Sequence, residues 1–289
     1  KTELDNTYID ALPIKQARSL MRYRERGQHH VAYRKQFGGA LLLGIQYRMH
    51  PSIAAFSSAM FYDGLLGTPA ALEAARPVPS FLRDLMPCEN SALGVRLINV
   101  GGRCNESRGE QNKFTTPRGG ENQAGLQEST TFTNEAEAIR VVSLIKDILK
   151  RDNPEDPSTP KTIGVVTPYT GQVQLIKSLV ASDPEIVTKA QDLAVSIEVK
   201  SVDGYQGRER DVIIFSAVRS NRRGNVGFLQ DWRRLNVALT RARNGLLVVG
   251  DADTLFEGDK HWASFIKWCH GVRCIVDETK SPQEHDSLQ

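Results

Sequence analysis

The sequence has no disulfide framework and no transmembrane segment. Its 289 residues include only four cysteines, Cys88, Cys104, Cys269 and Cys274, which are too few and too scattered for a disulfide scaffold. A zinc site at Cys269, His270 and Cys274 would need a fourth ligand and a tighter spacing. No run of about 18 apolar residues occurs, and the first ten residues do not have the layout of a secretion signal. These absences predict a protein with reduced thiols and no membrane partner, in the cytoplasm or alternatively in the nucleus.

The sequence also lacks a phosphate-binding loop. It contains no Gly-Lys pair, so the G-x-x-x-x-G-K-[ST] cradle, which holds nucleotide phosphates and supplies a magnesium-binding hydroxyl, is absent. The chain begins at Lys1 without a methionine, and we therefore expect it to be a piece of a longer protein.

Positive charge is concentrated in one segment. The whole chain has a net charge of +3, whereas residues 200–250 contain ten Lys or Arg and four Asp or Glu. A local excess of cations favours a polyanionic partner, either nucleotide phosphates or a nucleic-acid backbone. A solvated charged surface explains the charge alone equally well.

Apolar runs alternate with helical patterns along the chain. Several of the runs are continuous rather than alternating, which is typical of strands buried on both faces of a parallel sheet. The predicted strands are at 41–45, 95–100, 162–167, 195–200, 212–217 and 246–250. The predicted helices are at 51–61, 134–150, about 169–182, about 231–243 and about 261–269. This alternation predicts a three-layer α/β domain with a mainly parallel sheet flanked by helices.

The clearest helical pattern is at 134–150. Asn134 is suited to cap it, with Glu137 three residues later, and Ala138, Val142, Ile145 and Leu149 share one face. Residues 101–131, by contrast, have almost no large apolar side chains. We expect that segment to be a disordered insertion, because it cannot offset the entropy cost of ordering.

We expect four polar clusters at the carboxyl ends of predicted strands, where ligands bind in open α/β sheets. Gln46, Tyr47 and Arg48 follow the first run, and they combine a ring that can stack with a guanidinium that can bind phosphate. Thr167-Pro168-Tyr169 follows the run 162–167 and precedes a helix. A surface tyrosine and arginine, and a plain strand-to-helix turn, are the simpler alternatives.

Two further clusters are rich in charge. The loop 201–211, SVDGYQGRERD, contains two glycines that permit a tight turn, together with polar groups that are costly to desolvate. In 231–245, DWRRLNVALTRARNG, Asp231 caps the predicted helix, and Leu235, Ala238, Leu239 and Ala242 form its apolar stripe. On such a helix Arg234 and Arg241 would be aligned away from the stripe, either solvated or directed at phosphate.

These residues resemble a known family. Four blocks closely resemble, in this order, the C-terminal motor motifs of superfamily 1 helicases: QYRMHPSIAAFSSAMFYDGLL, VVTPYTGQVQLI, SVDGYQGRERDVIIFSAVRSN and VGFLQDWRRLNVALTRARNGLLVVGD. The resemblance is to the branch that contains senataxin and the up-frameshift helicase of nonsense-mediated decay. The resemblance covers roughly 40–68 and 132–268. That family has two RecA-like domains with ATP between them, and the phosphate loop belongs to the first.

The resemblance implies that residues 37–276 are the second RecA-like domain alone. Residues 1–36 would then be an extension from the preceding domain, and 277–289 a flexible tail. The partners that the resemblance implies are single-stranded RNA or DNA, the first RecA-like domain and regulatory proteins.

The resemblance also implies roles for individual residues in an ATP site. Tyr47 would pack on the adenine, Arg48 would reach the phosphates, and Gln46 would join this nucleotide-binding set. Glu209 would bind the ribose hydroxyls, and Arg241 would be the arginine finger, so Arg48 and Arg241 are the predicted catalytic residues. The ligands of the accompanying Mg²⁺ are expected from the absent first domain.

A second set matches the segments that hold single-stranded nucleic acid in the family: Thr167, Pro168, Tyr169, Ser201, Val202 and Asp203. The predicted function is therefore the second motor domain of a 5′-to-3′ ATP-dependent RNA helicase, inactive alone. A non-catalytic platform for RNA or protein, and a DNA-directed helicase, are the alternatives, because these segments contact backbone rather than base edges.

Overall fold

The computed structural model describes residues 43–84, 90, 92–102, 105–108, 132–150 and 159–279. The expected extension at 1–36 lies outside these residues, as do most of the insertion at 101–131 and most of the tail at 277–289.

Six strands form one sheet in which every pairing is parallel, in the order β5-β4-β6-β7-β1-β8. The strands are β1 (Val95–Asn99), β4 (Thr162–Thr167), β5 (Ser196–Ser201), β6 (Arg210–Ser216), β7 (Ala242–Gly250) and β8 (Ile275–Asp277). A separate antiparallel pair joins β2 (Glu106–Arg108) to β3 (Phe132–Asn134).

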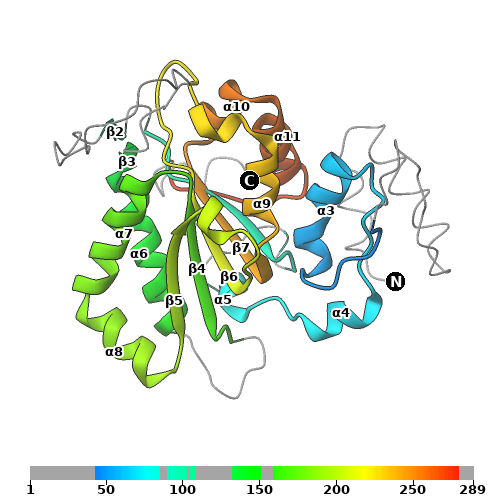
Figure 1. Ribbon diagram of the computed structural model, residues 1–289, viewed down its shortest axis with the longest axis horizontal. Helices are drawn as coiled ribbons and strands as arrows, with labels where there is room; N and C mark the ends of the chain where they lie inside the picture. Colours follow the sequence, from blue (N-terminus) through cyan, green and yellow to red (C-terminus); the bar gives the residue numbers. More distant parts are fainter. Residues whose placement is uncertain are drawn as a thin grey trace, which may run out of the picture.

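Helices cover both faces of the sheet (Figure 1). One face carries α6 (Glu135–Lys150), α7 (Thr170–Ser182) and α8 (Pro184–Asp192). The other carries α3 (Pro51–Phe61), α9 (Trp232–Leu239), α10 (Ala252–Gly258) and α11 (Lys260–Gly271). Two short helices, α4 (Ala70–Ala75) and α5 (Ser80–Asp84), connect α3 to β1, and single 3-10 turns, η1 (Asp203–Tyr205) and η2 (Gly227–Gln230), occur in loops.

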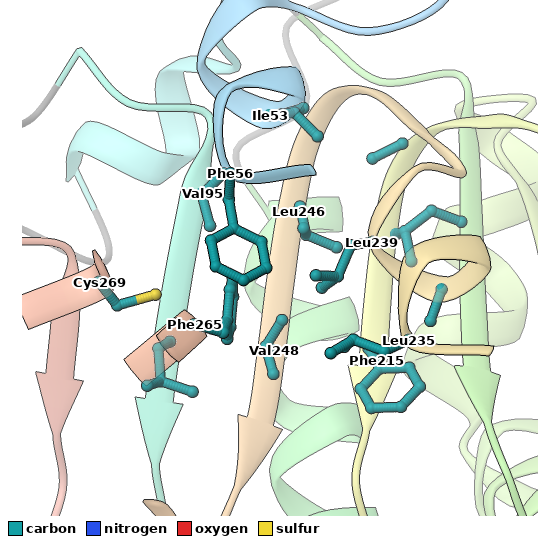
Figure 2. Packing of buried hydrophobic residues seen from close by; sticks show 14 of the residues in the cluster. Ile53, Phe56, Val95, Phe215, Leu235, Leu239, Leu246, Val248, Phe265 and Cys269 are labelled. Atoms are coloured by element: carbon teal, nitrogen blue, oxygen red, sulfur yellow. The ribbon is translucent and has the colours of Figure 1, made fainter. Parts of the chain in front are cut away.

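The central strands β1, β4, β6 and β7 are largely buried on both faces, as continuous apolar runs require, whereas the outer strands β5 and β8 are partly exposed. Along β7, Leu246 and Val248 pack in one core and Leu247 and Val249 in the other. Figure 2 shows the first core, where the rings of Phe56 from α3 and Phe265 from α11 meet with their centroids 5.1 Å apart. The predicted three-layer α/β fold, with a RecA-like parallel sheet flanked by helices, is confirmed.

Two predicted elements were wrong in extent. Residues 43–45 form no buried strand, because Leu43 is 76% exposed and Ile45 makes only an isolated bridge to Gly67. The helix predicted at 231–243 ends at Leu239, and β7 begins at Ala242, where the Arg241 carbonyl accepts a hydrogen bond from the Arg210 amide. Sheet pairing outcompetes the helical periodicity there, so Arg234 and Arg241 do not lie on one helix.

Ordered structure also reaches into segments expected to be irregular. Glu106–Arg108 forms β2 within the expected insertion, and Asp277 is the last residue of β8 rather than the start of the tail. The Asn99 amide donates to the Asp277 carboxylate at 3.2 Å. Pairing with β3 and with β1 orders these segments, and neither partner is close to them in sequence.

The predicted cap of α6 is present, and it is part of a buried polar network. The Asn134 side chain accepts from the Glu137 amide at 3.1 Å, and the carboxyl group of Glu137 accepts from Val218 N at 2.8 Å and from the Ser216 hydroxyl at 2.7 Å. Val218 has a φ of +72°, an unusual conformation for a β-branched residue. The network therefore stabilises a strained residue at the carboxyl end of β6.

We expect Glu137 to make stability depend on pH. Complete burial raises the pKa of Glu137 from 4.5 to about 8, although its hydrogen bonds oppose the shift. Above the unfolded pKa the folded state retains a proton that the unfolded chain loses. The free energy of unfolding should therefore fall as pH rises from about 4.5 to about 8, by up to about 1.4 kcal/mol per unit. Denaturant titrations across this range measure the slope.

Glu137→Gln should remove this contribution to the slope, because the amide does not titrate. Glu135→Gln is the matched control, since Glu135 is exposed on the same helix. An equal slope in the wild type and in Glu137→Gln would contradict the assignment.

Candidate functional site

Arg48, Glu209 and Arg241 meet at one edge of the sheet, at the amino ends of β6 and β7. Glu209 immediately precedes β6, and Arg241 immediately precedes β7. The loop that carries Arg48 reaches them because His50 N donates to the Arg243 carbonyl at 2.7 Å. The expectation that all four clusters lie at carboxyl ends of strands was therefore wrong for these residues.

Gln46 shapes the turn that presents Tyr47 and Arg48. Its side-chain carbonyl accepts from the amides of Arg48 and Met49, and its amide group donates to the Met49 carbonyl at 2.8 Å and to Thr68 Oγ1 at 2.6 Å. With Gln46 committed to the turn, the Tyr47 side chain points outward and is 66% exposed. Such an exposed ring is available to stack on a flat ligand.

Glu209 lies between two arginines. Arg48 Nε donates to Glu209 Oε2 at 2.6 Å, while Nε and Nη2 of Arg243 donate to Glu209 Oε1 at 2.9 and 2.6 Å. These hydrogen bonds, Arg48 first, hold the pKa of Glu209 below its usual value. All three side chains are about one-third exposed, at 30 to 34%, so this ionised cluster faces an accessible surface.

Arg241 is bound back onto the end of α9. Its Nε donates to the Val237 carbonyl at 2.9 Å and its Nη2 to Thr240 Oγ1 at 3.0 Å. Burial, and next the positive charge of Arg48, lower the pKa of Arg241 to about 10. The guanidinium therefore remains cationic at neutral pH, and no carboxylate within the described part of the chain forms an ion pair with it. Arg48 and Arg241 both donate to Thr240, so their guanidinium groups lie close together, an arrangement suited to a phosphate group.

The second predicted set lies at the opposite edge, at the carboxyl ends of β4 and β5. Ser201 ends β5, and Asp203, whose side chain is 70% exposed, follows it. Arg234 Nη2 contacts the Asp203 carboxylate at 3.3 Å and its guanidinium carbon lies 4.8 Å from the centre of the Phe228 ring. Polar groups of this edge are therefore accessible beside a half-buried aromatic ring.

Thr167 and Tyr169 are buried, contrary to their expected exposure at a binding surface. Thr167 is 0% and Tyr169 1% exposed. The Tyr169 ring packs against Phe132 and Phe228, and its hydroxyl accepts from Arg219 Nη1 at 3.2 Å. No open face of Tyr169 can stack on a base in this structure. Val202 is buried as well, at 3%, so within this set Pro168, Ser201 and Asp203 are the groups nearer the surface.

The loop 202–209 connects the two edges by crossing one face of the sheet. It leaves the carboxyl end of β5 and enters the amino end of β6, and midway the Tyr205 ring is completely buried, at 0% exposure. The ring fits because Gly164, in the middle of β4, has no side chain: a Cβ atom there would lie 2.8 Å from Tyr205 Cζ. The crossing places Ser201 and Glu209 at opposite ends of one packed segment.

Sequence reasoning missed Arg243 and Asp211 at the first edge, and Glu106 and Arg219 at the second. Glu106 Oε2 accepts from Arg219 Nε at 2.9 Å and from Ser220 N at 2.8 Å. The sequence signal for Arg243 was its membership of a group of arginines, which did not distinguish it from its neighbours. No local pattern links Glu106 to Arg219, because they are 113 positions apart.

Neither a metal cluster nor a membrane span is evident in the part of the chain that the structure describes. No three His, Cys, Asp or Glu side chains gather there in a way that could hold a metal ion. No described helix combines the length and the apolar character needed to cross a bilayer.

Comparisons with known proteins give one family match and several similar proteins. A family profile described as an AAA domain matches residues 28–253. The chain is 37% identical over 244 residues to Regulator of nonsense transcripts 1 of Dictyostelium discoideum, covering 81% of this chain and 15% of the relative. It is 32% identical over 237 residues to Helicase sen1 of Schizosaccharomyces pombe, covering 82% and 12%. It is 34% identical over 232 residues to DNA polymerase alpha-associated DNA helicase A of Saccharomyces cerevisiae, covering 78% and 30%. The chain thus spans less than a third of each relative.

Proposed function

Because the chain belongs to this AAA domain family and is a superfamily 1 helicase domain of the up-frameshift and senataxin type, we propose that it is the second motor domain of an ATP-dependent helicase. In this proposal residues 37–276 form that domain, and a preceding first domain supplies the phosphate loop and the magnesium ligands. The chain alone would then be catalytically silent.

The observation that carries the proposal is the cluster of Tyr47, Arg48, Glu209 and Arg241. A ring, a carboxylate and two cations at one accessible edge match the parts of ATP: Tyr47 for the adenine, Glu209 for the ribose hydroxyls, and the arginines for the phosphates. Phosphoryl transfer to water is accelerated when cations stabilise the charge on the γ-phosphate. With its other half on a separate domain, such a site would make hydrolysis depend on domain closure.

The opposite edge supports a proposed nucleic-acid contact. Pro168, Ser201 and Asp203, with the nearby Arg234, lie where the loop 202–209 starts, and Glu209 lies where it ends. A bound nucleic acid that shifts this loop would therefore act on the nucleotide site through one packed segment. Single-stranded RNA is the proposed ligand, and the cytoplasm is the proposed location. The proposed 5′-to-3′ polarity rests on the family resemblance.

A DNA-directed helicase is the second candidate, because one similar protein is named a DNA helicase. A non-catalytic platform is less well supported, since Arg48, Glu209 and Arg241 are all present and grouped.

The function is tested by Tyr47→Ala in the chain joined to its first motor domain. Loss of the exposed ring should weaken nucleotide affinity by about tenfold, as expected for roughly 1–2 kcal/mol of stacking. Binding of an RNA oligonucleotide without nucleotide should be nearly unchanged. Fluorescence titrations with labelled ADP and with labelled RNA measure both affinities.

Phe256→Ala is the control, because Phe256 is an aromatic residue on α10 that is 42% exposed. If Tyr47→Ala weakens RNA binding and leaves nucleotide affinity intact, Tyr47 belongs to the nucleic-acid surface and the proposed site is wrong.

A further inference from the structure

Glu209 and Arg48 form an ion pair in this structure, although the proposed function assigns each of them to a different part of the nucleotide. Their contact, Arg48 Nε to Glu209 Oε2 at 2.6 Å, is the shortest polar contact of Arg48 with any described residue, and Arg48 Nη1 also donates to the Thr240 carbonyl at 3.0 Å. Full engagement of the Arg48 guanidinium by a phosphate would require its Nε to leave Glu209. A carboxylate left without a cation in a partly buried position would resist that separation.

Arg243 removes this difficulty, because it binds Glu209 independently of Arg48. It approaches the other carboxylate oxygen, Oε1, with two nitrogen atoms at 2.9 and 2.6 Å. Both donors hold the same oxygen in place, and the adjacent cation favours the ionised form of the carboxylate. Departure of Arg48 would therefore leave Oε2 free and Glu209 still ionised and oriented.

The backbone directs Arg243 toward Glu209 by an irregularity in the sheet. Arg210 pairs with Ala242 and Val212 with Gly245, so Arg243 and Asn244 on β7 stand opposite Asp211 alone on β6. Such bulges re-aim side chains. Asp211 completes the arrangement, since its Oδ1 contacts Arg243 Nη1 at 3.5 Å and its Oδ2 accepts from Thr162 N and Thr162 Oγ1.

We propose that Arg243 is a positioning residue that keeps Glu209 oriented for the ribose while Arg48 is released from Glu209 to the phosphates. This inference rests on the proposed function. It predicts that without Arg243 the ion pair between Arg48 and Glu209 persists, so that the contacts to ribose and to phosphate are lost together.

The test uses the chain joined to its first motor domain and compares ADP with 2′,3′-dideoxy-ADP, which lacks both ribose hydroxyls. Calorimetric titration gives both dissociation constants without hydrolysis. The wild type should prefer ADP by about tenfold, the worth of a hydrogen bond to a charged group. Arg243→Gln should bring the preference close to one, while Arg48→Ala should keep it, and Arg243→Lys should retain part of it.

The double variant Arg48→Ala/Arg243→Gln separates positioning from mere structural support. If Arg48 traps Glu209 in Arg243→Gln, removal of Arg48 should restore part of the preference for ADP. The inference would be overturned if the preference for ADP persists in Arg243→Gln. It would also be overturned if the double variant does not recover any of that preference. If Glu209→Gln abolishes the preference for ADP but Arg243→Gln leaves it intact, the role of Arg243 alone would be overturned. No discrimination in the wild type would also overturn the ribose role of Glu209.

Discussion

Replacing Arg241 by alanine is expected to lower the turnover number of the complete helicase by about 10³- to 10⁵-fold, with a much smaller change in nucleotide affinity. In the proposed function the guanidinium stabilises charge that develops on the γ-phosphate during hydrolysis. It is not neutralised by a carboxylate within the described residues, and its hydrogen bonds to Val237 and Thr240 hold it near Arg48. Steady-state hydrolysis with saturating RNA, together with ADP titration, separates the two quantities.

Arg233→Ala is the matched control for Arg241. Arg233 lies on α9 with 74% of its side chain exposed, and its contact with Asp231 is long, at 3.9 Å. Its loss should leave turnover nearly unchanged. Should Arg241→Ala lower affinity and turnover by equal factors, Arg241 would be an ordinary binding residue rather than an arginine finger.

Gly164→Ala is expected to destabilise the domain by an amount toward the upper end of about 1–3 kcal/mol, the usual cost of overpacking. The new methyl group would lie 2.8 Å from Tyr205 Cζ and 2.6 Å from Ile213 Cδ1. Since the Tyr205 ring is completely buried, the loop 202–209 would have to move away from the sheet. We therefore also expect RNA to stimulate hydrolysis less, because this loop links the two edges.

Two variants, measured by chemical denaturation, test the cause of the lost stability. Gly245→Ala, on β7, should cost much less, because its nearest neighbours are Leu82 Cδ1 at 3.3 Å and Val212 Cγ2 at 3.4 Å. Tyr205→Phe should partly rescue Gly164→Ala, since the tyrosine hydroxyl is the atom closest to the new methyl group. Purely additive effects of the two substitutions would show that the contact with Tyr205 is not responsible.

The fold could be predicted from local patterns where burial is uniform. The runs at 95–100, 162–167 and 212–217 are strands because they are apolar on both faces, as a covered parallel sheet requires. The pattern failed at residues 43–45, where Leu43 is exposed, and at 240–243, where helical spacing continues into β7. In both places the outcome depends on pairing with distant segments, which local periodicity does not contain.

The sequence by itself determined the residue types of the proposed nucleotide site: Tyr47, Arg48, Glu209 and Arg241. The tertiary structure decided how they are arranged. It brings Arg48 to Glu209 across 161 positions, and it adds Arg243 through a bulge. It also buries Tyr169, because Phe132, Phe228 and Arg219 converge on that ring from separate segments. Chemical character belongs to each side chain, whereas exposure and partnership belong to the packing of segments that only the folded chain brings together.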